Sequence, residues 1–422
     1  MQGWQIQGRA GARRGTGARC WRRLAAMAGV VAASLGVAAP PVAAPTHEVY
    51  VWQRVWNEPL RGALGDSRDL FSGVRVLVAQ VSGDGRWQAT QADPAALTGD
   101  ARRRVAVVRF DGAGQAPVAE SLLAELRPLL ARWQSGAAPF AAVEIDYDCG
   151  TARLADYAER LRTLRGGLPA GLALSVTALP AWLDAGELDG VLDAVDESVL
   201  QVHAVQRPAA GLFDAASAER WARAFARRTT RPFRLALPAY GTRVYFDDAG
   251  QPRAVESEAR LEDRPALPGE ELAAEPREVL SLLARLRADP PAHWQGVAWF
   301  RLPLPGDRRA WTLAALREVI AGTLPRARFE VRLTPQANGA HDLALANGGT
   351  VAAPAPALRV ATACNAHDAV GDWIAAGDAT RLRFLPKPGF RLPPGRTSPV
   401  GWLRCAQAPV VTIEDSQAKD VQ

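Results

Sequence analysis

The chain has 422 residues, of which 48% are hydrophobic and 22% charged, a balance that excludes a disordered or collagen-like protein. No apolar run reaches the roughly 18 residues that a membrane-spanning helix needs. Six arginines precede residue 45, where there is no acidic residue, so they account for the whole formal net charge of +6. Residues 45–422 are therefore neutral overall, which excludes a broad basic surface for nucleic acid or anionic lipid.

The first 44 residues have the three parts of a secretory signal peptide. An arginine-rich start leads into the apolar stretch Leu24–Val37, and small residues follow up to Ala44. We therefore expect cleavage near Ala44 and a mature protein that is periplasmic or secreted, with no stable membrane span. An uncleaved anchor is the alternative. The pair Arg22-Arg23 suggests twin-arginine export, although its sequence context matches that signal poorly.

Eight short β-type runs alternate with helical segments between residues 48 and 322. Segments with apolar residues at helical spacing, such as Val118–Trp133 and Pro276–Leu286, separate several of the runs. Eight strands alternating with helices over roughly 250 residues are typical of an α/β protein of the (β/α)8 TIM-barrel type. A doubly wound open sheet is the alternative, but it usually carries a glycine-rich turn after its first strand, and Trp52–Pro59 has none. The eight runs are residues 48–56, 75–81, 104–111, 142–149, 172–179, 198–205, 233–240 and 296–302.

The segment after the seventh run, residues 241–275, is long, acidic and irregular. Segments of this length often act as lids or binding loops, and a surface hairpin of Arg243–Phe246 with Arg253–Ser257 is the alternative. Beyond Leu324 the helical pattern stops, and short β-type pieces follow, separated by Pro, Gly and Asn. The predicted organisation is a signal peptide (1–44), a barrel (45–324), a small β-sandwich-like module (325–414) and a disordered tail (415–422).

Residues 140–149, which contain the fourth run, include an alternation of apolar and acidic side chains. Successive side chains of a strand point to opposite faces, and the apolar set of a barrel strand should face the helices. Glu144, Asp146 and Asp148 are then predicted to line the lumen, roughly 6.5–7 Å apart at Cα. Carboxylates this close in a partly dry space cannot all ionise freely, so at least one pKa should rise enough for a general acid. Because barrel enzymes place their active sites at this end of the strands, all three are candidate catalytic residues.

The same alternation sends other polar and aromatic side chains towards this end of the barrel. His203 can orient a carboxylate or hydrogen-bond a substrate hydroxyl, or it is a satisfied core histidine. Tryptophans, among them Trp52 and Trp56, offer flat apolar faces for stacking on sugar rings, or they belong to the core. Arg109 and Arg301 can instead pair with the acids, which would make the acidic cluster structural. The candidate substrate-binding residues are Trp52, Arg109, Gln201, His203, Tyr240, Trp299 and Arg301.

Three cysteines follow the predicted leader. Cys364 and Cys405 lie in the β-rich C-terminal segment and can pair in an oxidising compartment. Cys149 ends an apolar run with no adjacent histidine, so we expect a buried packing residue rather than a nucleophile. A divalent-metal site of the three acids and His203 is a further reading, but three acids on one strand spread over roughly 13 Å, too far to reach one ion. We predict no metal and no other cofactor.

The pattern Phe-x-x-Val-Glu-Ile-Asp-Tyr-Asp at residues 140–148 resembles the fourth-strand signature of the chitinase-like glycoside hydrolases of family eighteen. Matched by position, Glu144 and Asp146 take the places of the family's second and third aspartates, and Asp148 that of its glutamate acid. The resemblance implies that Asp148 protonates the leaving oxygen while Asp146 orients the substrate's N-acetyl group, which acts as nucleophile. The chain departs from the family at Ala141, which replaces the first aspartate, and at Asp148, whose side chain is one methylene shorter. The sixth run also lacks the family's Met-x-Tyr-Asp pattern.

A second resemblance extends over residues 48–240. The stretches 143–149, 174–182 and 200–203 are similar to signatures of a family of uncharacterised secreted bacterial proteins with a domain of unknown function. This resemblance implies a barrel fold and leaves the activity open.

Together, the sequence predicts an exported barrel that binds a carbohydrate and, if it is an enzyme, hydrolyses a polysaccharide or glycan by carboxylate acid catalysis. Asp148 would be the general acid, Asp146 the orienting group, and Glu144 the residue that tunes their pKa values. A substrate-assisted mechanism fits, because no second carboxylate on another run stands out. The alternative is a noncatalytic barrel that binds a carbohydrate or another partner, which the missing first aspartate and the shortened acid favour.

Overall fold

The computed structural model describes residues 45–111, 118–203, 211–247, 252–256, 268–307, 309–378 and 381–414. The predicted signal peptide, the predicted tail, the end of the sixth run at residues 204–205 and Ser257 of the predicted hairpin lie outside the described residues. Within the described ranges, no helix is both long enough and apolar enough to cross a membrane.

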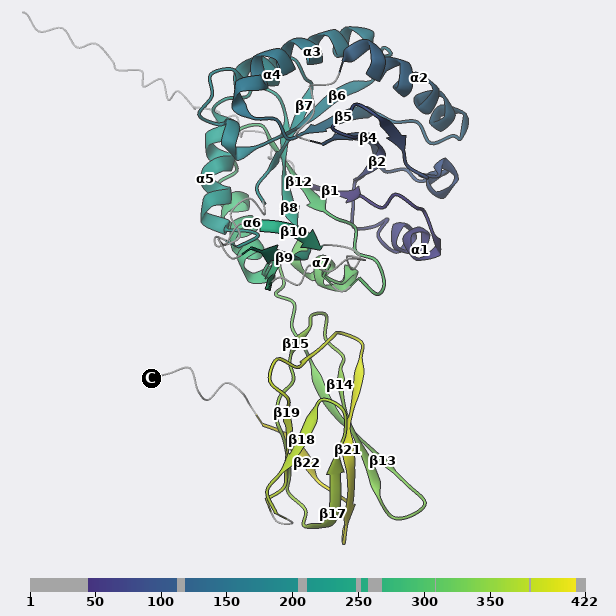
Figure 1. Ribbon diagram of the computed structural model, residues 1–422, viewed down its shortest axis with the longest axis vertical. Coiled ribbons are helices and arrows are strands. Elements are labelled where there is room, and N and C mark those ends of the chain that lie inside the picture. Colours follow the sequence, from purple (N-terminus) through teal and green to yellow (C-terminus); the bar gives the residue numbers. More distant parts are fainter. Residues whose placement is uncertain are drawn as a thin grey trace, which may run out of the picture. The chain divides into compact units, whose positions relative to one another are not determined.

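Eight parallel strands form a closed barrel (Figure 1). β1 pairs with β2 on one side and with β12 on the other, which closes the ring. Each predicted run overlaps one of these strands, so the (β/α)8 barrel is confirmed and the doubly wound sheet is excluded. The strands around the ring are β1 (Thr46–Val51), β2 (Gly73–Val81), β4 (Arg103–Phe110), β5 (Ala142–Tyr147), β6 (Ala173–Ala178), β7 (Glu197–Gln201), β8 (Phe233–Pro238) and β12 (Trp294–Phe300).

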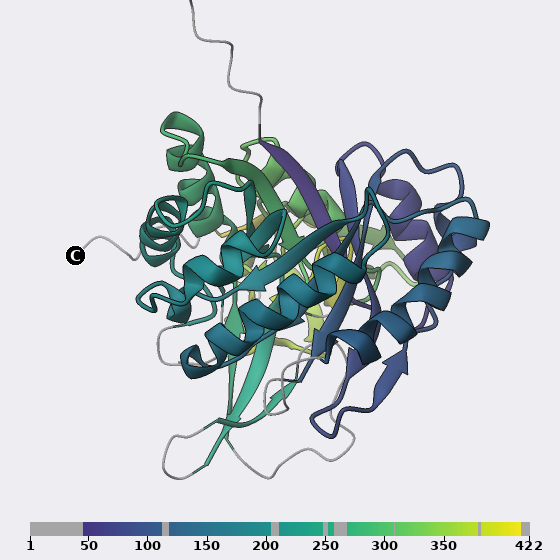
Figure 2. The same ribbon diagram turned by 90° about the horizontal axis from the view of Figure 1, so that it is seen from above.

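Helices lie outside the strands (Figure 2). Their buried apolar residues pack against the strands in one core. Leu122 and Leu126 of α2, for example, are buried one helical turn apart against the barrel. Helices α1 and α4 were not predicted, because they span only nine and six residues and show too little of a helical period. The helices are α1 (Glu58–Asp66), α2 (Ala119–Ser135), α3 (Leu154–Gly167), α4 (Leu188–Asp193), α5 (Ala215–Ala226), α6 (Pro276–Ala288) and α7 (Leu313–Ile320), with short 3-10 turns at Pro94–Leu97, Thr151–Arg153 and Pro180–Trp182.

Strand alternation divides the barrel into an outer and an inner core. The outer core lies between strands and helices and includes Val143, Ile145 and Tyr147 of β5. The lumen holds a smaller apolar cluster, so side chains fill the barrel as in other folds of this class. The buried residues of that cluster are Tyr50, Val107, Val199, Ala236 and Ala298.

Short antiparallel strands extend the barrel at two places. β3 (Trp87–Ala89) pairs with the end of β2. After β8, the strands β9 (Gly241–Phe246), β10 (Pro252–Glu256) and β11 (Gly269–Ala273) form a separate three-stranded sheet. The predicted hairpin is therefore present as β9 and β10, and the sheet is fixed at Glu256, a buried carboxylate that accepts a hydrogen bond from Tyr245 and pairs with Arg309.

The C-terminal region consists of antiparallel sheets, as predicted. Two four-stranded sheets contribute to one hydrophobic cluster, which includes Leu343, Leu358, Phe384 and Leu403. A disulfide joins Cys364 to Cys405, residues that face each other on neighbouring strands. The strands are β13 (Phe329–Pro335), β14 (His341–Asn347), β15 (Ala353–Pro354), β16 (Leu358–Val360), β17 (Cys364–Ala369), β18 (Trp373–Ala376), β19 (Arg383–Pro386), β20 (Arg391–Leu392), β21 (Thr397–Cys405) and β22 (Val411–Ile413).

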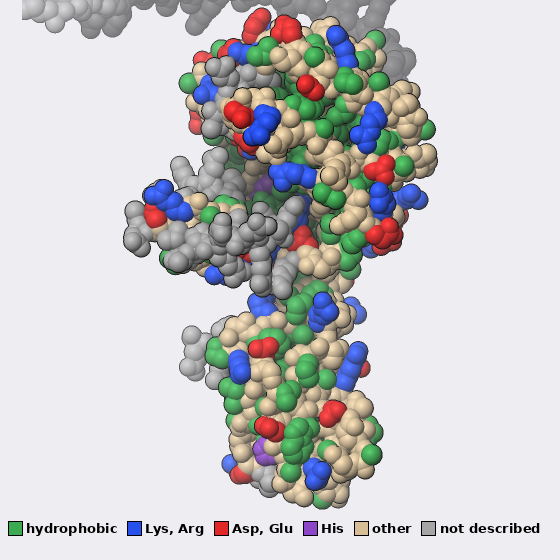
Figure 3. Space-filling model, turned by 45° about the vertical axis from the view of Figure 1, so that its right-hand side comes forward, with side chains coloured by type: hydrophobic (Ala, Val, Ile, Leu, Met, Phe, Trp, Pro, Cys, Tyr) green, Lys and Arg blue, Asp and Glu red, His purple; other side chains and the backbone are tan. Residues whose placement is uncertain are grey.

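Charged side chains of both signs are interspersed on the face shown in Figure 3. This distribution agrees with the neutral composition of residues 45–422 and gives that face no extended field of one sign.

Candidate functional site

The acidic side chains of β5 lie inside the barrel, as the alternation predicted. Tyr147, between Asp146 and Asp148 in sequence, is fully buried on the helix side, in ring contact with Tyr157 of α3. Glu144, Asp146 and Asp148 instead contact side chains of the lumen. Because parallel strands in this barrel end at the same rim, the row runs from the middle of the barrel to its C-terminal mouth.

Glu144, the deepest of the three acids, is fully buried and fully partnered. Its carboxylate accepts a hydrogen bond from the Tyr50 hydroxyl at 2.6 Å and forms an ion pair with Arg75. The hydroxyl groups of Ser175 and Thr177 lie 3.2 and 3.4 Å from its oxygens. The structure therefore places Glu144 below the mouth, where it acts on the other acids only through its charge.

A buried ionic network lies beneath Glu144. Arg75 also pairs with Glu48 at 2.7 Å and with Glu197 at 3.2 Å, while Arg103 and Arg234 approach the same carboxylates from β4 and β8. The nearby guanidinium groups outweigh the effect of burial and lower the pKa of Glu48. At this end of the lumen, which we call the ionic floor, each carboxylate described above is paired with a guanidinium group, so the floor is structural.

Asp146 is the acid with the perturbed titration. Burial, more than any neighbour, raises its pKa to about 7, and the negative charges of Asp148 and Glu144 add to the rise while Arg109 opposes it. Its Oδ2 lies 3.0 Å from the Arg109 guanidinium, and its buried Oδ1 has no hydrogen-bond partner among the described residues. A buried carboxyl oxygen without a partner is costly unless it is protonated or bound by a ligand.

Asp148 stands at the rim, with about a quarter of its side chain exposed. The same Arg109 guanidinium donates a hydrogen bond to its Oδ2 at 2.7 Å, and its Oδ1 is buried and unpartnered within the part of the chain that the structure describes. One arginine therefore bridges two carboxyl groups that each keep one oxygen free. Burial would lower the pKa of Arg109, but the two aspartates outweigh it and raise that pKa, so the guanidinium stays charged.

His203 and Tyr240 form a buried polar pair beside the mouth. The Tyr240 hydroxyl lies 3.4 Å from His203 Nδ1, and both rings contact Phe300. Burial lowers the pKa of His203 to about 3 and raises that of Tyr240 to about 12, so both are neutral near pH 7. Gln201, the last residue of β7, donates a hydrogen bond to the His203 carbonyl at 3.1 Å.

The predicted tryptophans separate into two groups. Trp52 is half-buried in the lumen, where its ring lies 5.0 Å from that of Phe300. Trp299, predicted for the mouth, is fully buried on the helix side of β12, where its indole lies 3.1 Å from His47 Nδ1. Trp56 likewise packs in the outer core. The prediction for Trp299 is wrong because its register partner is Val49, an outward residue of β1, and sequence alternation alone did not fix that pairing.

Phe300 takes the place that the sequence analysis gave to Trp299. It follows Trp299 on β12, so it points to the other face, and it contacts Tyr50, Trp52, His203 and Tyr240. The sequence held one indication of this role for Phe300: it follows Trp299 directly, so the two side chains must point to opposite faces of the strand. Which of the two faces the lumen could not be decided from the sequence.

Arg301 is not a partner of the acid row. It is buried and pairs with Asp307 at 2.6 Å, after the end of β12. Of the two arginines predicted to neutralise the acids, Arg109 is the one that the structure brings to Asp146 and Asp148. The described residues contain no group of three or more His, Cys, Asp or Glu side chains placed to hold a metal ion.

Comparison with known proteins confirms the second resemblance noted in the sequence. Residues 100–305 match the family model of a domain of unknown function, DUF3142, and residues 330–406 match that of another, DUF8456. A search of curated proteins finds no match to the chain.

Solved structures with a similar arrangement include spore cortex-lytic enzymes and chitinases. SleL from Bacillus cereus is 12% identical, over 66% of this chain and 74% of that one, with a TM-score of 0.48. SleL from Bacillus megaterium QM B1551 is also 12% identical, over 68% and 76%, with a TM-score of 0.49. A chitinase from Chromobacterium violaceum ATCC 12472 is 14% identical, over 66% and 98%, with a TM-score of 0.46.

Proposed function

We propose that the chain is an exported protein that binds a carbohydrate at the barrel mouth and hydrolyses it by carboxyl acid catalysis. The observation that carries the proposal is the arrangement of Asp146 and Asp148. Asp146 belongs to β5 and Asp148 follows its last residue, and both side chains lie on the lumen side. They share the guanidinium of Arg109, and each keeps one buried oxygen without a partner among the described residues. The resemblance of residues 140–148 to a glycoside hydrolase signature supports the assignment.

Asp146, Arg109 and Asp148 form one charged unit, in which Asp146 is the group that titrates near pH 7. With both aspartates ionised the unit carries one net negative charge, and with a proton on Asp146 it is neutral. Because the pKa of Asp146 is about 7, Asp146 holds this proton for about half the time at neutral pH. The unit is therefore suited to give up and take back one proton during a reaction.

In the proposed step, Asp148 takes up the proton of Asp146 and passes it to the glycosidic oxygen. The bond between that oxygen and the anomeric carbon breaks, and its electron pair stays on the oxygen. The two carboxylates, now both ionised, stabilise the positive charge on the sugar. The substrate's own acetamido oxygen or a water molecule attacks the anomeric carbon, and water finally supplies the proton that returns to the unit.

Neutral and aromatic groups complete the proposed sugar site. Trp52 and Phe300 are half-buried and offer apolar ring faces at the mouth, while the neutral pair His203 and Tyr240 can hydrogen-bond hydroxyl groups without adding charge. Export is proposed from the apolar leader, and the Cys364–Cys405 disulfide supports an oxidising compartment.

A noncatalytic carbohydrate-binding barrel is the second candidate function. The contact that favours it is Arg109, which occupies one oxygen of both aspartates and would hold Asp148 as a carboxylate that accepts hydrogen bonds but donates none. The two candidates differ in whether a glycan that binds is also cut.

The test measures new reducing ends from a panel of N-acetylhexosamine polysaccharides, with the variants Asp148→Asn and Asp146→Asn. Asp193→Asn, at an exposed position of α4, is the matched control. We expect hydrolysis by the wild type and the control, and a loss of about a hundredfold or more in both site variants. Binding without hydrolysis by the wild type supports the second candidate. Full hydrolysis by Asp148→Asn would refute the catalytic assignment.

A further inference from the structure

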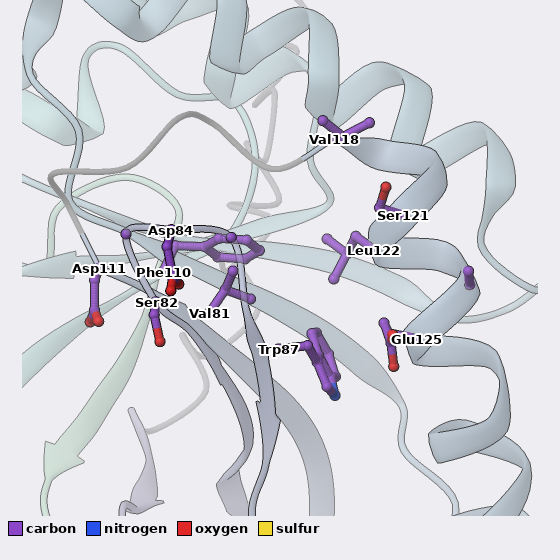
Figure 4. A pocket seen from close by; sticks show the side chains of 13 residues that line it. Val81, Ser82, Asp84, Trp87, Phe110, Asp111, Val118, Ser121, Leu122 and Glu125 are labelled. Carbon is purple, nitrogen blue, oxygen red and sulfur yellow. The ribbon is translucent and has the colours of Figure 1, made fainter.

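A cavity of about 730 Å³ lies beside the barrel mouth, between β2, β3, β4 and α2 (Figure 4). It is distinct from the lumen, because its buried wall residues Phe110 and Leu122 belong to the outer core. Neither candidate catalytic carboxyl lines it, and the mechanism proposed above makes no use of it.

The cavity lies close to Arg109, the partner of both Asp146 and Asp148. Asp111, which lines it, follows Arg109 by two residues, and the Asp111 backbone N–H still bonds the Val81 carbonyl at 3.0 Å in the manner of the strand. Same-face neighbours on a strand are roughly 6.5–7 Å apart at Cα. A polymer bound across the proposed catalytic pair can therefore continue from Arg109 past Asp111 into the cavity.

An aromatic surface forms part of the cavity wall. Trp87 of β3 is half-buried, with part of its indole against the outer core. Leu122 of α2 points into the cavity on the side where Trp87 lies (Figure 4). With Phe110 and Leu122 it makes an apolar surface of the kind that accepts the flat face of a sugar ring.

The charge of the cavity is negative. Its lining includes the carboxylates of Asp84, Asp111 and Glu125, and no described lining residue carries a positive charge. Asp84 lies 3.7 Å from Arg86, but both side chains are largely exposed, so this pair offsets little of the charge. In Figure 4 Glu125 lies on the Trp87 side of the cavity, whereas Asp84 and Asp111 lie on the opposite side.

We propose that this cavity binds a sugar unit with a free amine, so that the substrate is a cationic glycan with both N-acetylated and unacetylated hexosamine units. This rests on the proposed function, which it extends from a carbohydrate in general to one class. The ammonium group would donate charge-assisted hydrogen bonds to Asp111 or Glu125 while the ring stacks on Trp87. A neutral sugar leaves these carboxylates without a partner of opposite charge.

The test compares binding of two oligosaccharides of equal length to the full chain by calorimetry, one fully N-acetylated and one fully de-N-acetylated glucosamine oligomer. We expect the de-N-acetylated oligomer to bind about tenfold more tightly, with a preference that shrinks as salt is added. The double variant Asp111→Asn/Glu125→Gln should abolish the preference. Trp87→Ala should weaken both oligomers, and Glu120→Gln, at an exposed position of α2 outside the cavity, should change neither. Circular dichroism checks that each variant is folded.

Three results would overturn the inference: equal affinity for the two oligomers, a preference that survives the double variant, or a lysine oligomer of equal charge that binds as tightly as the glucosamine oligomer. Failure of the proposed function is separate from these. An amine preference with no hydrolysis by any variant leaves the cavity assignment in place and removes catalysis. Hydrolysis of fully acetylated glycans without an amine preference would leave the catalytic assignment in place and remove the cavity assignment.

Discussion

Arg109 of β4 lies opposite Asp146 of β5 in the register of the barrel, and its guanidinium is 3.0 Å from that carboxyl. The same guanidinium reaches Asp148, two residues further along β5. The pairing is asymmetric, because Asp146 is almost completely buried while Asp148 is a quarter exposed. Burial thus raises the pKa of one acid of a bridged pair, and the other acid faces the mouth.

Replacing Arg109 tests how strongly the bridge restrains the pair. In Arg109→Gln the pKa of Asp146 should rise above its present value of about 7, because the guanidinium now opposes the rise. The free energy of unfolding should fall by about 2 kcal/mol at pH 7, less than for a fully buried pair, because Asp146 can take up a proton. The loss should grow as the pH increases through 7. Urea unfolding at pH 5, 7 and 8.5 measures it. Arg160→Gln, which breaks an exposed pair with Asp156, is the control and should cost under about 0.5 kcal/mol.

The raised pKa of Asp146 should make the free energy of unfolding fall as the pH increases. Its pKa is raised from 3.8 to about 7 in the folded state, so between these values the folded chain binds more protons than the unfolded chain. Stability relative to Asp146→Asn should therefore fall as the pH increases from 4 to 7, by up to about 4 kcal/mol, and stay level above. Unfolding curves of the two proteins across this range give the difference directly. A difference that does not change with pH would contradict a raised pKa.

The lowered pKa of His203 should make the free energy of unfolding fall as the pH decreases, the opposite of the effect of Asp146. Its pKa is lowered from 6.5 to about 3, so as the pH falls below 6.5 the unfolded chain binds more protons and the folded state loses stability. In His203→Phe this acid-dependent loss should disappear, at a cost of about 1 kcal/mol near pH 7.5 for the hydrogen bond with Tyr240. The variant should then become the more stable protein below about pH 5. Thermal unfolding at pH 4.5 and 7.5 checks whether the order reverses.

The barrel could be predicted from the sequence because its strands repeat a simple pattern. Apolar runs, bounded by turn residues and separated by amphipathic segments, gave each of the eight barrel strands, and the acid-apolar alternation of residues 140–149 gave the correct inward face. Helices α1 and α4 are so short that each shows the helical spacing of apolar residues only once. The ionic floor around Arg75 was also missed, since it joins residues from six strands whose register the sequence does not show.

The candidate site could be predicted only in part, for the same reason. Asp146, Asp148 and Arg109 belong to neighbouring strands, so alternation alone brought them together. Trp299 was assigned to the wrong face because the parity of β12 depends on its register with β1. The cavity beside the mouth was not foreseen, because it is formed by the short strand β3 and the start of α2, which no motif links.

Trp299 and Phe300 provide a matched test of the two faces of β12. Trp299→Ala removes a fully buried indole from the outer core and should cost about 3–5 kcal/mol of stability, with little effect on glycan binding by the folded fraction. Phe300→Ala removes a half-buried ring at the mouth and should weaken glycan binding by about tenfold at a smaller cost in stability. Urea unfolding and calorimetric titration with an N-acetylhexosamine oligomer measure both effects. Weaker binding in Trp299→Ala alone would place the sugar on the other side of the strand.

The disulfide between Cys364 and Cys405 should stabilise the C-terminal sheets. It closes a loop with a sequence separation of 41, and the entropy that such a cross-link removes from the unfolded chain corresponds to about 4 kcal/mol. Reduction should therefore lower the unfolding temperature of the C-terminal sheets, and Cys364→Ala/Cys405→Ala should behave like the reduced protein. Cys149→Ala removes the buried free thiol and should keep the response to reductant. Calorimetric scans with and without reductant measure the shift. An unchanged transition would mean that the sheets are held by their apolar cluster and gain no stability from the disulfide.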